Sequence, residues 1–178
     1  MKRVFVLLFL GLVLTSVVNA QEYNKFKLGL GAGYAGGSDA KGFSGGGGAL
    51  LTLEPAYRIS DNLAFGLRIE TAFYGSGYGG AGIPGGFVSI TTNVQYYFNI
   101  KPFRPFVGAG LGIFAHNEIE FGFYPRIGFD WGHFTFALEY NLIPIGSEDY
   151  DYQTGTTSTS SAYYIGIRVG GFFFGGKN

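Results

Sequence analysis

Apolar and polar residues alternate along residues 124–142, Tyr-Pro-Arg-Ile-Gly-Phe-Asp-Trp-Gly-His-Phe-Thr-Phe-Ala-Leu-Glu-Tyr-Asn-Leu, on both sides of Gly132. Strict alternation indicates β-strands. The Gly-His pair favours a two-residue type II′ turn, because glycine takes the required positive φ without strain. This turn sets the register of the predicted hairpin, in which Arg126 faces Glu139 across the two strands.

The two faces of this hairpin differ in a way that suits a membrane barrel. One face is bulky and apolar, with Ile, Phe, Trp, Leu and Tyr, and the other carries Arg126, Gly128, Asp130, Ala137 and Glu139. In a water-soluble sandwich or barrel the apolar face points inward. Here the small and oppositely charged residues suit the crowded inside of a small barrel, and the bulky aromatics suit lipid contact. We therefore predict an inside-out barrel.

The same alternation recurs along the chain. Eight segments show it, each near the roughly 9 to 11 residues of a tilted membrane strand: 26–34, 49–59, 63–73, 87–98, 106–114, 124–131, 134–142 and 162–174. The connections alternate between short turns and longer segments at 36–48, 74–86, 115–122 and 143–161, as periplasmic turns and extracellular loops do. The predicted fold class is all-β, an eight-stranded antiparallel up-and-down transmembrane β-barrel.

The N-terminus has the pattern of a secretory signal peptide. Lys2 and Arg3 precede an apolar run over 4–18, and Val-Asn-Ala ends at Ala20 as a small-residue cleavage site. The run is shorter than the roughly 20 residues of a transmembrane helix. We predict a signal peptide at 1–20, cleavage after Ala20 and a barrel domain at 21–178. The mature chain then has 10 basic and 12 acidic residues, so its charge of about −2 gives no electrostatic argument for a nucleic-acid partner.

Composition points the same way. The chain is 47% hydrophobic, 19% aromatic and 13% charged, and it has 32 glycines. A soluble protein with so many aromatic and so few charged residues would tend to associate, whereas a lipid-facing barrel needs such a surface. The absence of cysteine excludes disulfides, thiolate metal sites and a lipid-modified cysteine.

Together these features resemble the small eight-stranded outer-membrane barrels of the OmpA and OmpX type in Gram-negative bacteria. The resemblance rests on the signal peptide, the alternating segments, residues 104–112 (Arg-Pro-Phe-Val-Gly-Ala-Gly-Leu-Gly) and 124–129 (Tyr-Pro-Arg-Ile-Gly-Phe), and the aromatic 172–174 of the last strand. It implies a non-enzymatic protein of the cell outer membrane, in contact with outer-membrane lipid and recognised by the barrel assembly machinery. It also implies a role in envelope integrity or in adhesion, with an extracellular ligand bound through the loops. No cofactor is expected.

Six charged residues fall on the inward faces of the predicted strands: Glu54, Arg68, Glu70, Arg126, Glu139 and Arg168. Pairing Ile59 with Leu63 in the second hairpin places Glu54 opposite Arg68, which repeats the first hairpin's arrangement. Eight strands leave an interior just wide enough for side chains. A salt-bridged plug is therefore favoured over a pore for ions or small solutes.

Aromatic residues on the outward faces are predicted to form two girdles at the membrane interfaces. The girdle near the short turns comprises Tyr57, Tyr96, Phe98, Trp131 and Phe134, and the girdle near the loops comprises Tyr34, Phe73, Phe87, Tyr140 and Tyr163.

Three other patterns carry less weight. Residues 31–36 and 75–80 match G-x-G-x-x-G, but a dinucleotide site needs a helix that begins at this loop, and neither segment predicts one. His116 is the candidate for a second alternative, a lipid A-modifying enzyme, although no serine on an adjacent strand pairs with it. The carboxylates of 148–151 are of the type that binds calcium, but their spacing fits no EF-hand, so a solvated loop is the simpler interpretation.

Overall fold

The computed structural model describes residues 24–38, 47–74, 85–98, 102–115, 119–151 and 156–174, and at 38, 74, 85, 145–151 and 156–162 it describes the backbone alone. Eight strands run through these residues: β1 (Phe26–Ser38), β2 (Gly47–Arg58), β3 (Leu63–Tyr74), β4 (Gly85–Tyr97), β5 (Phe103–Ala115), β6 (Ile119–Trp131), β7 (Phe134–Asp151) and β8 (Thr156–Phe172). The predicted signal peptide at 1–20 lies outside them. Within the described segments, no helix has the length and apolar character needed to cross a membrane.

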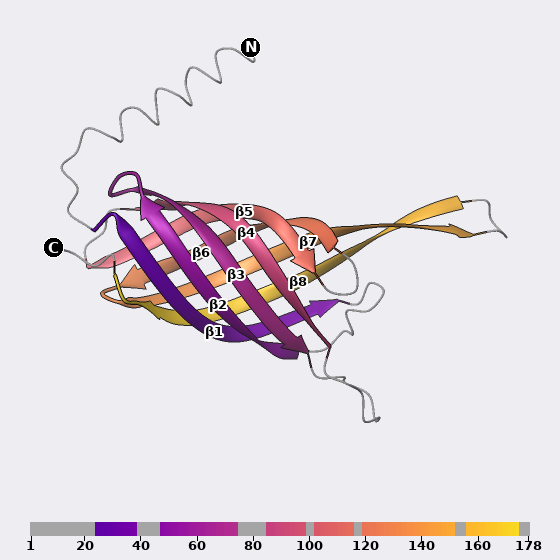
Figure 1. The fold of residues 1–178 in the computed structure, drawn as a ribbon, viewed down its shortest axis with the longest axis horizontal. Coiled ribbons are helices and arrows are strands. Elements are labelled where there is room, and N and C mark those ends of the chain that lie inside the picture. Colours follow the sequence, from indigo (N-terminus) through magenta and orange to yellow (C-terminus); the bar gives the residue numbers. More distant parts are fainter. Residues whose placement is uncertain are drawn as a thin grey trace, which may run out of the picture.

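The strands close into a single barrel (Figure 1). Each strand pairs antiparallel with the next one along the chain, and β8 returns to pair antiparallel with β1. The predicted fold, an eight-stranded antiparallel up-and-down barrel, is confirmed. Below, the end that holds the β2–β3 and β6–β7 turns is called the turn end, and the opposite end is called the loop end.

The two short hairpins have the registers that the sequence predicts. In β6–β7, Trp131 pairs with Phe134 and Arg126 with Glu139, and Gly132 has a φ of 59°. A positive φ of this size is why glycine suits the turn. The β2–β3 partners likewise keep the register that follows from pairing Ile59 with Leu63, so the inward and outward faces of both hairpins are as predicted.

The loop-end parts of several strands are longer than the sequence predicts, and β1 continues to Ser38, inside the loop predicted over 36–48. Strand β6 begins at Ile119, inside the connection predicted over 115–122, and β7 and β8 continue to Asp151 and Thr156, inside the loop predicted over 143–161. Beyond a bulge between Pro144 and Glu148, these two strands pair mainly with each other and form a ribbon that projects past the barrel wall (Figure 1). The loop prediction over 143–161 is wrong because residues 145–151 and 156–161 show no regular apolar alternation in the sequence. Residues 119–123, Ile-Glu-Phe-Gly-Phe, do alternate, and the sequence reasoning missed that signal.

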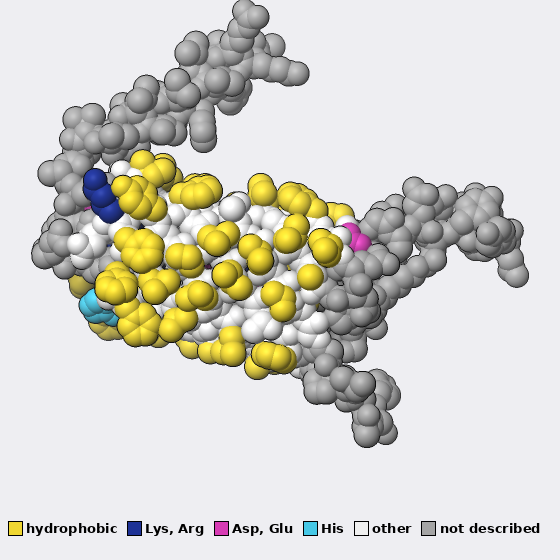
Figure 2. Space-filling model, viewed as in Figure 1, with side chains coloured by type: hydrophobic (Ala, Val, Ile, Leu, Met, Phe, Trp, Pro, Cys, Tyr) yellow, Lys and Arg dark blue, Asp and Glu magenta, His cyan; other side chains and the backbone are white. Residues whose placement is uncertain are grey.

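The outside of the barrel is apolar and the inside is polar, as predicted. Ile127 is 55% exposed, whereas its neighbour Arg126 is 3% exposed. On the face shown in Figure 2, hydrophobic side chains cover the wall, and the charged and histidine side chains that the structure describes are seen only near the two ends. Because adjacent residues of a strand point to opposite faces, this exposure pattern gives the sheet its inverted polarity along every strand.

Candidate functional site in the barrel interior

All six predicted charged residues lie inside the barrel. They come from β2, β3, β6, β7 and β8 and occupy inward positions of their strands. The charged side chains point into the middle of the lumen because the residues next to them on each strand are largely apolar and face outward, and adjacent residues of a strand point to opposite faces. We call these six residues, Glu54, Arg68, Glu70, Arg126, Glu139 and Arg168, the central network.

Two carboxylates and two guanidiniums form a ring of alternating charge within the central network. Arg126 lies 2.6 Å from Glu54 and, through Nε, 3.5 Å from Glu139. Arg168 makes the same two connections, at 2.8 Å to Glu54 and 3.0 Å to Glu139. Each arginine therefore bridges the same two acids, and the acids are held apart from each other by positive charge.

Arg68 connects this ring to the third acid. Its guanidinium donates to Glu139, lies 3.7 Å from Glu70 and donates a 3.1 Å hydrogen bond to Asn141. The sequence predicts Arg68 opposite Glu54 on the neighbouring strand. Apart from the contact of Arg68 with Glu70 on its own strand, the ion pairs found for the two residues instead join them to strands that are not their neighbours, because long side chains in a narrow barrel reach other strands as easily as their own neighbour.

Aromatic side chains enclose the network toward the loop end. The guanidinium of Arg68 lies 3.7 Å from the centre of the Tyr124 ring, within the range of a cation–π interaction. The hydroxyl of Tyr164 donates a 2.6 Å hydrogen bond to Glu70. The sequence reasoning did not assign these tyrosines a role in the network, although both stand on inward positions.

Glycines on the inward faces make room for these long side chains. A Cβ added at Gly110 would lie 2.3 Å from the Tyr124 ring, and one added at Gly31 would lie 2.9 Å from the Cδ of Arg168. Both distances are shorter than side-chain packing tolerates, so a larger residue at either position would force Tyr124 or Arg168 to move.

The structure also has a second charged cluster, at the turn end, that the sequence prediction did not include. It is called the turn-end cluster below. The ammonium of Lys27 lies 2.6 Å from Asp130, and Arg58 lies 4.0 Å from the same carboxylate. The cations of Lys27, Arg58 and Arg104 surround the Tyr97 ring at 5.6, 5.8 and 4.6 Å from its centre. Inward alternation identifies Lys27, Arg58 and Asp130, but Arg104 falls in the short connection predicted between the strands 87–98 and 106–114, part of which β5 includes.

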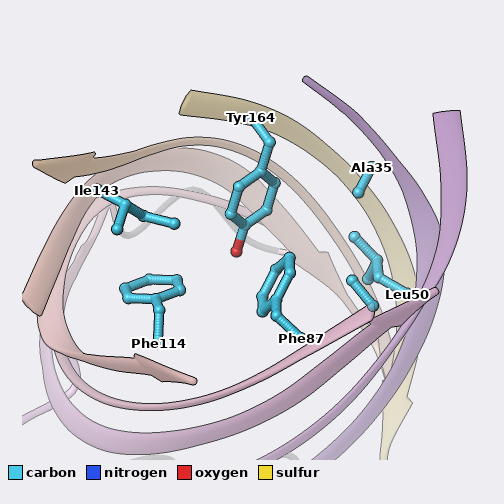
Figure 3. Close-up of a cluster of buried hydrophobic side chains, with 7 residues drawn as sticks. Ala35, Leu50, Phe87, Phe114, Ile143 and Tyr164 are labelled. Carbon is cyan, nitrogen blue, oxygen red and sulfur yellow. The ribbon is translucent and has the colours of Figure 1, made fainter. Parts of the chain in front are cut away.

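The loop end of the lumen is closed by apolar side chains, which the sequence reasoning also missed. The cluster, called the apolar lid below, comprises Ala35, Leu50, Ala72, Phe87, Phe114, Ile143 and Tyr164. Figure 3 shows these side chains converging inside the barrel from several strands. The signal was present, since each of these residues has the inward parity of its strand.

Phe87 is therefore a correction to the predicted loop-end girdle. It is 2% exposed and packs against Phe114 and Tyr164 inside the barrel, because its neighbour Val88 takes the outward position. The structure leaves the other predicted girdle residues exposed on the outside: Tyr57, Tyr96, Phe98, Trp131, Phe134, Tyr34, Phe73, Tyr140 and Tyr163.

Little free volume is found between the turn-end cluster and the central network. A cavity of about 20 Å³ lies there, lined by residues that include Lys27, Glu54, Arg126 and Arg168. This is room for about one water molecule. The interior thus consists of three layers along the barrel axis, the turn-end cluster, the central network and the apolar lid.

The remaining candidate motifs gain no support as sites. Residues 31–36 lie within β1, where no helix follows to bind phosphate, and 75–80 lie outside the described residues, as does His116. The carboxyl groups of 148–151 are likewise not described. Among the side chains that the structure does place, no three His, Cys, Asp or Glu residues are grouped in a way that suits a metal ion.

No protein-family model matches this chain, and no curated protein matches it. Among solved structures, it is similar to the crystal structure of Neisserial surface protein A (NspA), with a TM-score of 0.55 and 16% identity over 84% of this chain and 97% of that one. It is also similar to the N-terminal β-barrel domain of Pseudomonas aeruginosa OprF, with a TM-score of 0.44 and 14% identity over 85% and 99%. Both are eight-stranded outer-membrane β-barrels, and the likeness to NspA shows that this chain has that fold.

Proposed function

We propose that this chain is a non-enzymatic integral protein of a bacterial outer membrane, with a closed interior and a loop end that displays segments to other molecules. The observation that carries the proposal is the inverted polarity of the barrel. Ile127, Trp131 and Phe134 belong to a band of exposed apolar residues on the outer wall, while Arg126, Asp130 and Glu139 on the same strands are buried. In water such a surface would associate, whereas acyl chains solvate it.

The three interior layers support a plug over a pore. The alternating ring around Glu54 and Glu139 neutralises its own charges, and the apolar lid lies between this ring and the loop end. An ion crossing the barrel would have to break several buried ion pairs and then pass through packed aromatic side chains. Breaking one buried pair already costs about 3 to 5 kcal/mol.

The loop end supports the display role. The paired β7–β8 ribbon continues past Tyr163, the residue nearest the loop end at which β8 pairs with β1, and so stands clear of the wall (Figure 1). Segments held away from the membrane on a rigid barrel are well placed for adhesion or ligand binding. Outer-membrane lipid and, for the aromatic end of β8, the barrel assembly machinery complete the proposed partners.

Membrane insertion is tested by fractionating cells and comparing the gel mobility of unboiled and boiled outer-membrane protein. We expect the chain in the outer-membrane fraction, with an unboiled form that migrates faster because the barrel stays compact. Recovery in the soluble periplasmic fraction, or one mobility before and after boiling, would contradict the proposal.

The closed interior is tested by conductance across planar lipid bilayers. The purified barrel should give no discrete channels under conditions in which a general porin does. Stepwise openings that scale with salt concentration would favour the pore instead. Acyl hydrolysis of lipid A by the same preparation, lost in His116→Ala, would favour an enzyme.

The display role is tested by replacing residues 145–161 with a short turn. The residues that pair β6 with β7 and β8 with β1 lie outside 145–161. The barrel wall should therefore stay closed, and the variant should keep its heat-dependent mobility. Cells that carry it should lose attachment to an extracellular matrix or host-cell surface that the intact chain supports. Unchanged attachment would remove the ribbon from the proposed role.

A further inference from the structure

A groove crosses the outer wall of the barrel over β3 to β6. Its volume is about 610 Å³, within the roughly 300 to 1,000 Å³ of pockets that hold small molecules. Its lining includes the small outward residues Thr92, Ala109 and Pro125, called its floor below, and the larger Phe65, Leu111 and Phe123. We call this feature the wall groove. It arises because outward positions that are bulky elsewhere on the wall are small here.

The chemistry of the wall groove is apolar throughout. Within the part of the chain that the structure describes, no charged residue lines it. The hydroxyl of Thr92 is already used, because it donates a 3.4 Å hydrogen bond to the carbonyl oxygen of Leu111. Pro125 brings no N–H group to the floor. The acceptor lone pairs of the Thr92 hydroxyl are the only side-chain hydrogen-bonding capacity that the outward-facing lining residues offer an occupant, which favours a hydrocarbon chain over a polar molecule.

The polar residues behind the floor are engaged with the lumen. Tyr124 lies 3.3 Å from Thr91 through its hydroxyl and stacks on Arg68 through its ring. Asn93 accepts a 2.9 Å hydrogen bond from Gln95. Neither side chain is free to turn outward and bind a head group in the wall groove.

The wall groove runs from near the turn end toward the middle of the barrel wall. Phe65 stands two residues after Leu63, the first residue of β3 at the turn end, whereas Ala109 lies midway along β5. These residues share one row of cross-strand pairs, Phe65 with Val94 and Val94 with Ala109. Because barrel strands tilt by about 35 to 45° from the membrane normal, this row rises from the turn end toward the middle of the membrane.

We infer that the wall groove holds one acyl chain of a phospholipid whose head group lies at the turn-end face. This inference rests on the proposed function, which places the apolar wall in lipid with the short turns facing the periplasm. The groove is continuous with that wall, so the chain of a neighbouring lipid enters it without crossing a polar rim. A lipid bound in the wall groove exchanges with the bulk membrane more slowly than the lipids around it.

The test measures binding of a palmitoyl-oleoyl phosphatidylethanolamine probe to the delipidated, folded barrel by native mass spectrometry. Ala109→Phe places a ring in the wall groove from its floor. Ala32→Phe is the matched control, since Ala32 is also an exposed outward alanine and stands on β1, away from the groove. Heat-dependent gel mobility confirms that each variant is folded before binding is measured.

We expect a one-lipid adduct in the wild type and in Ala32→Phe, and at least tenfold weaker binding in Ala109→Phe. Equal binding in all three proteins, or equal loss in both variants, would overturn the inference. Displacement of the probe by an equimolar amount of lipid A would overturn the assignment to a turn-end phospholipid. A dimer that Ala109→Phe abolishes would assign the groove to a second copy of the chain.

These outcomes are distinct from failure of the proposed function. A chain that is absent from the outer-membrane fraction, or that shows no heat-dependent mobility, fails as a membrane barrel before lipid is added. A folded outer-membrane barrel with no preferential lipid adduct keeps the proposed function and loses the wall groove as a binding site.

Discussion

Replacing Glu139 with glutamine removes one negative charge from the centre of the barrel and keeps the shape of the side chain. The carboxylate is 1% exposed and contacts the guanidiniums of Arg68, Arg126 and Arg168. Without it, the ring loses one of its two acids, and three buried arginines are left with fewer negative partners than before.

The size of the effect follows from this loss. Breaking a buried ion pair by removing one partner costs about 3 to 5 kcal/mol, because the other charge stays buried without compensation. At about 1.4 kcal/mol per factor of ten, the folding equilibrium constant should fall by two to four orders of magnitude. Glu54→Gln should cost less, since Glu54 contacts two arginines of the ring and its side chain is 12% exposed.

The assay is equilibrium unfolding by urea of the barrel in lipid vesicles. Trp131, the only tryptophan of the chain, is 61% exposed on the outer wall, so its fluorescence reports the loss of lipid contact on unfolding. Glu120→Gln, a half-buried acid near the loop end of β6, is the control and should change the free energy of unfolding by less than about 0.5 kcal/mol.

A result within about 0.5 kcal/mol of the wild type for Glu139→Gln as well would refute the reasoning. It would mean that the central network is hydrated or protonated enough to absorb the change. The double variant Arg68→Met and Glu139→Gln provides a second check, because partners in direct contact should show a coupling energy of about 0.5 to 3 kcal/mol. Additive effects would count against a direct interaction.

Three further substitutions test local features of the barrel by the same unfolding assay. Gly110→Ala should cost about 1 to 3 kcal/mol, because its Cβ would lie 2.3 Å from an aromatic ring, whereas Gly29→Ala meets its nearest atom at 3.5 Å and should cost less. Gly132→Ala has free space but a φ of 59°, so backbone strain alone should cost about 1 to 2 kcal/mol, and no cost would contradict the turn geometry. Tyr164→Phe removes a 2.6 Å hydrogen bond to the carboxylate of Glu70 and should cost about 1.5 to 3 kcal/mol. An unchanged urea midpoint of unfolding would count against that bond.

The inverted wall was predictable from the sequence because one turn determines a whole register. Once Gly132 is placed at the turn, every residue of the hairpin is assigned to a face by counting, and the pair of Arg126 and Glu139 follows. A slip of one residue would place every apolar side chain on the wrong face, so the assignment is robust. The same counting places the six charges of the central network inside.

Most partners of those charges were not predictable by counting. Register gives the neighbour on the next strand, as it does for Arg126 and Glu139, but Glu54 on β2 contacts Arg126 on β6 and Arg168 on β8, neither of which is a neighbouring strand. Side-chain reach in a narrow barrel decides those contacts. The girdle assignment of Phe87 fails for a different reason, since aromatic character was weighed above the inward parity of its position.

The glycines and the charges of the interior depend on each other. The ring of two acids and two arginines and the tyrosine beside it fit inside eight strands only where inward glycines such as Gly31, beside Arg168, and Gly110, beside Tyr124, leave the space that side chains would fill. Conversely, those glycines would leave cavities if the arginines and tyrosines above them were short, and voids of that kind are destabilising. The high glycine content and the sparse but buried charge are therefore two aspects of one packing solution, in which long polar side chains from a few strands fill the space that small residues on the others leave open.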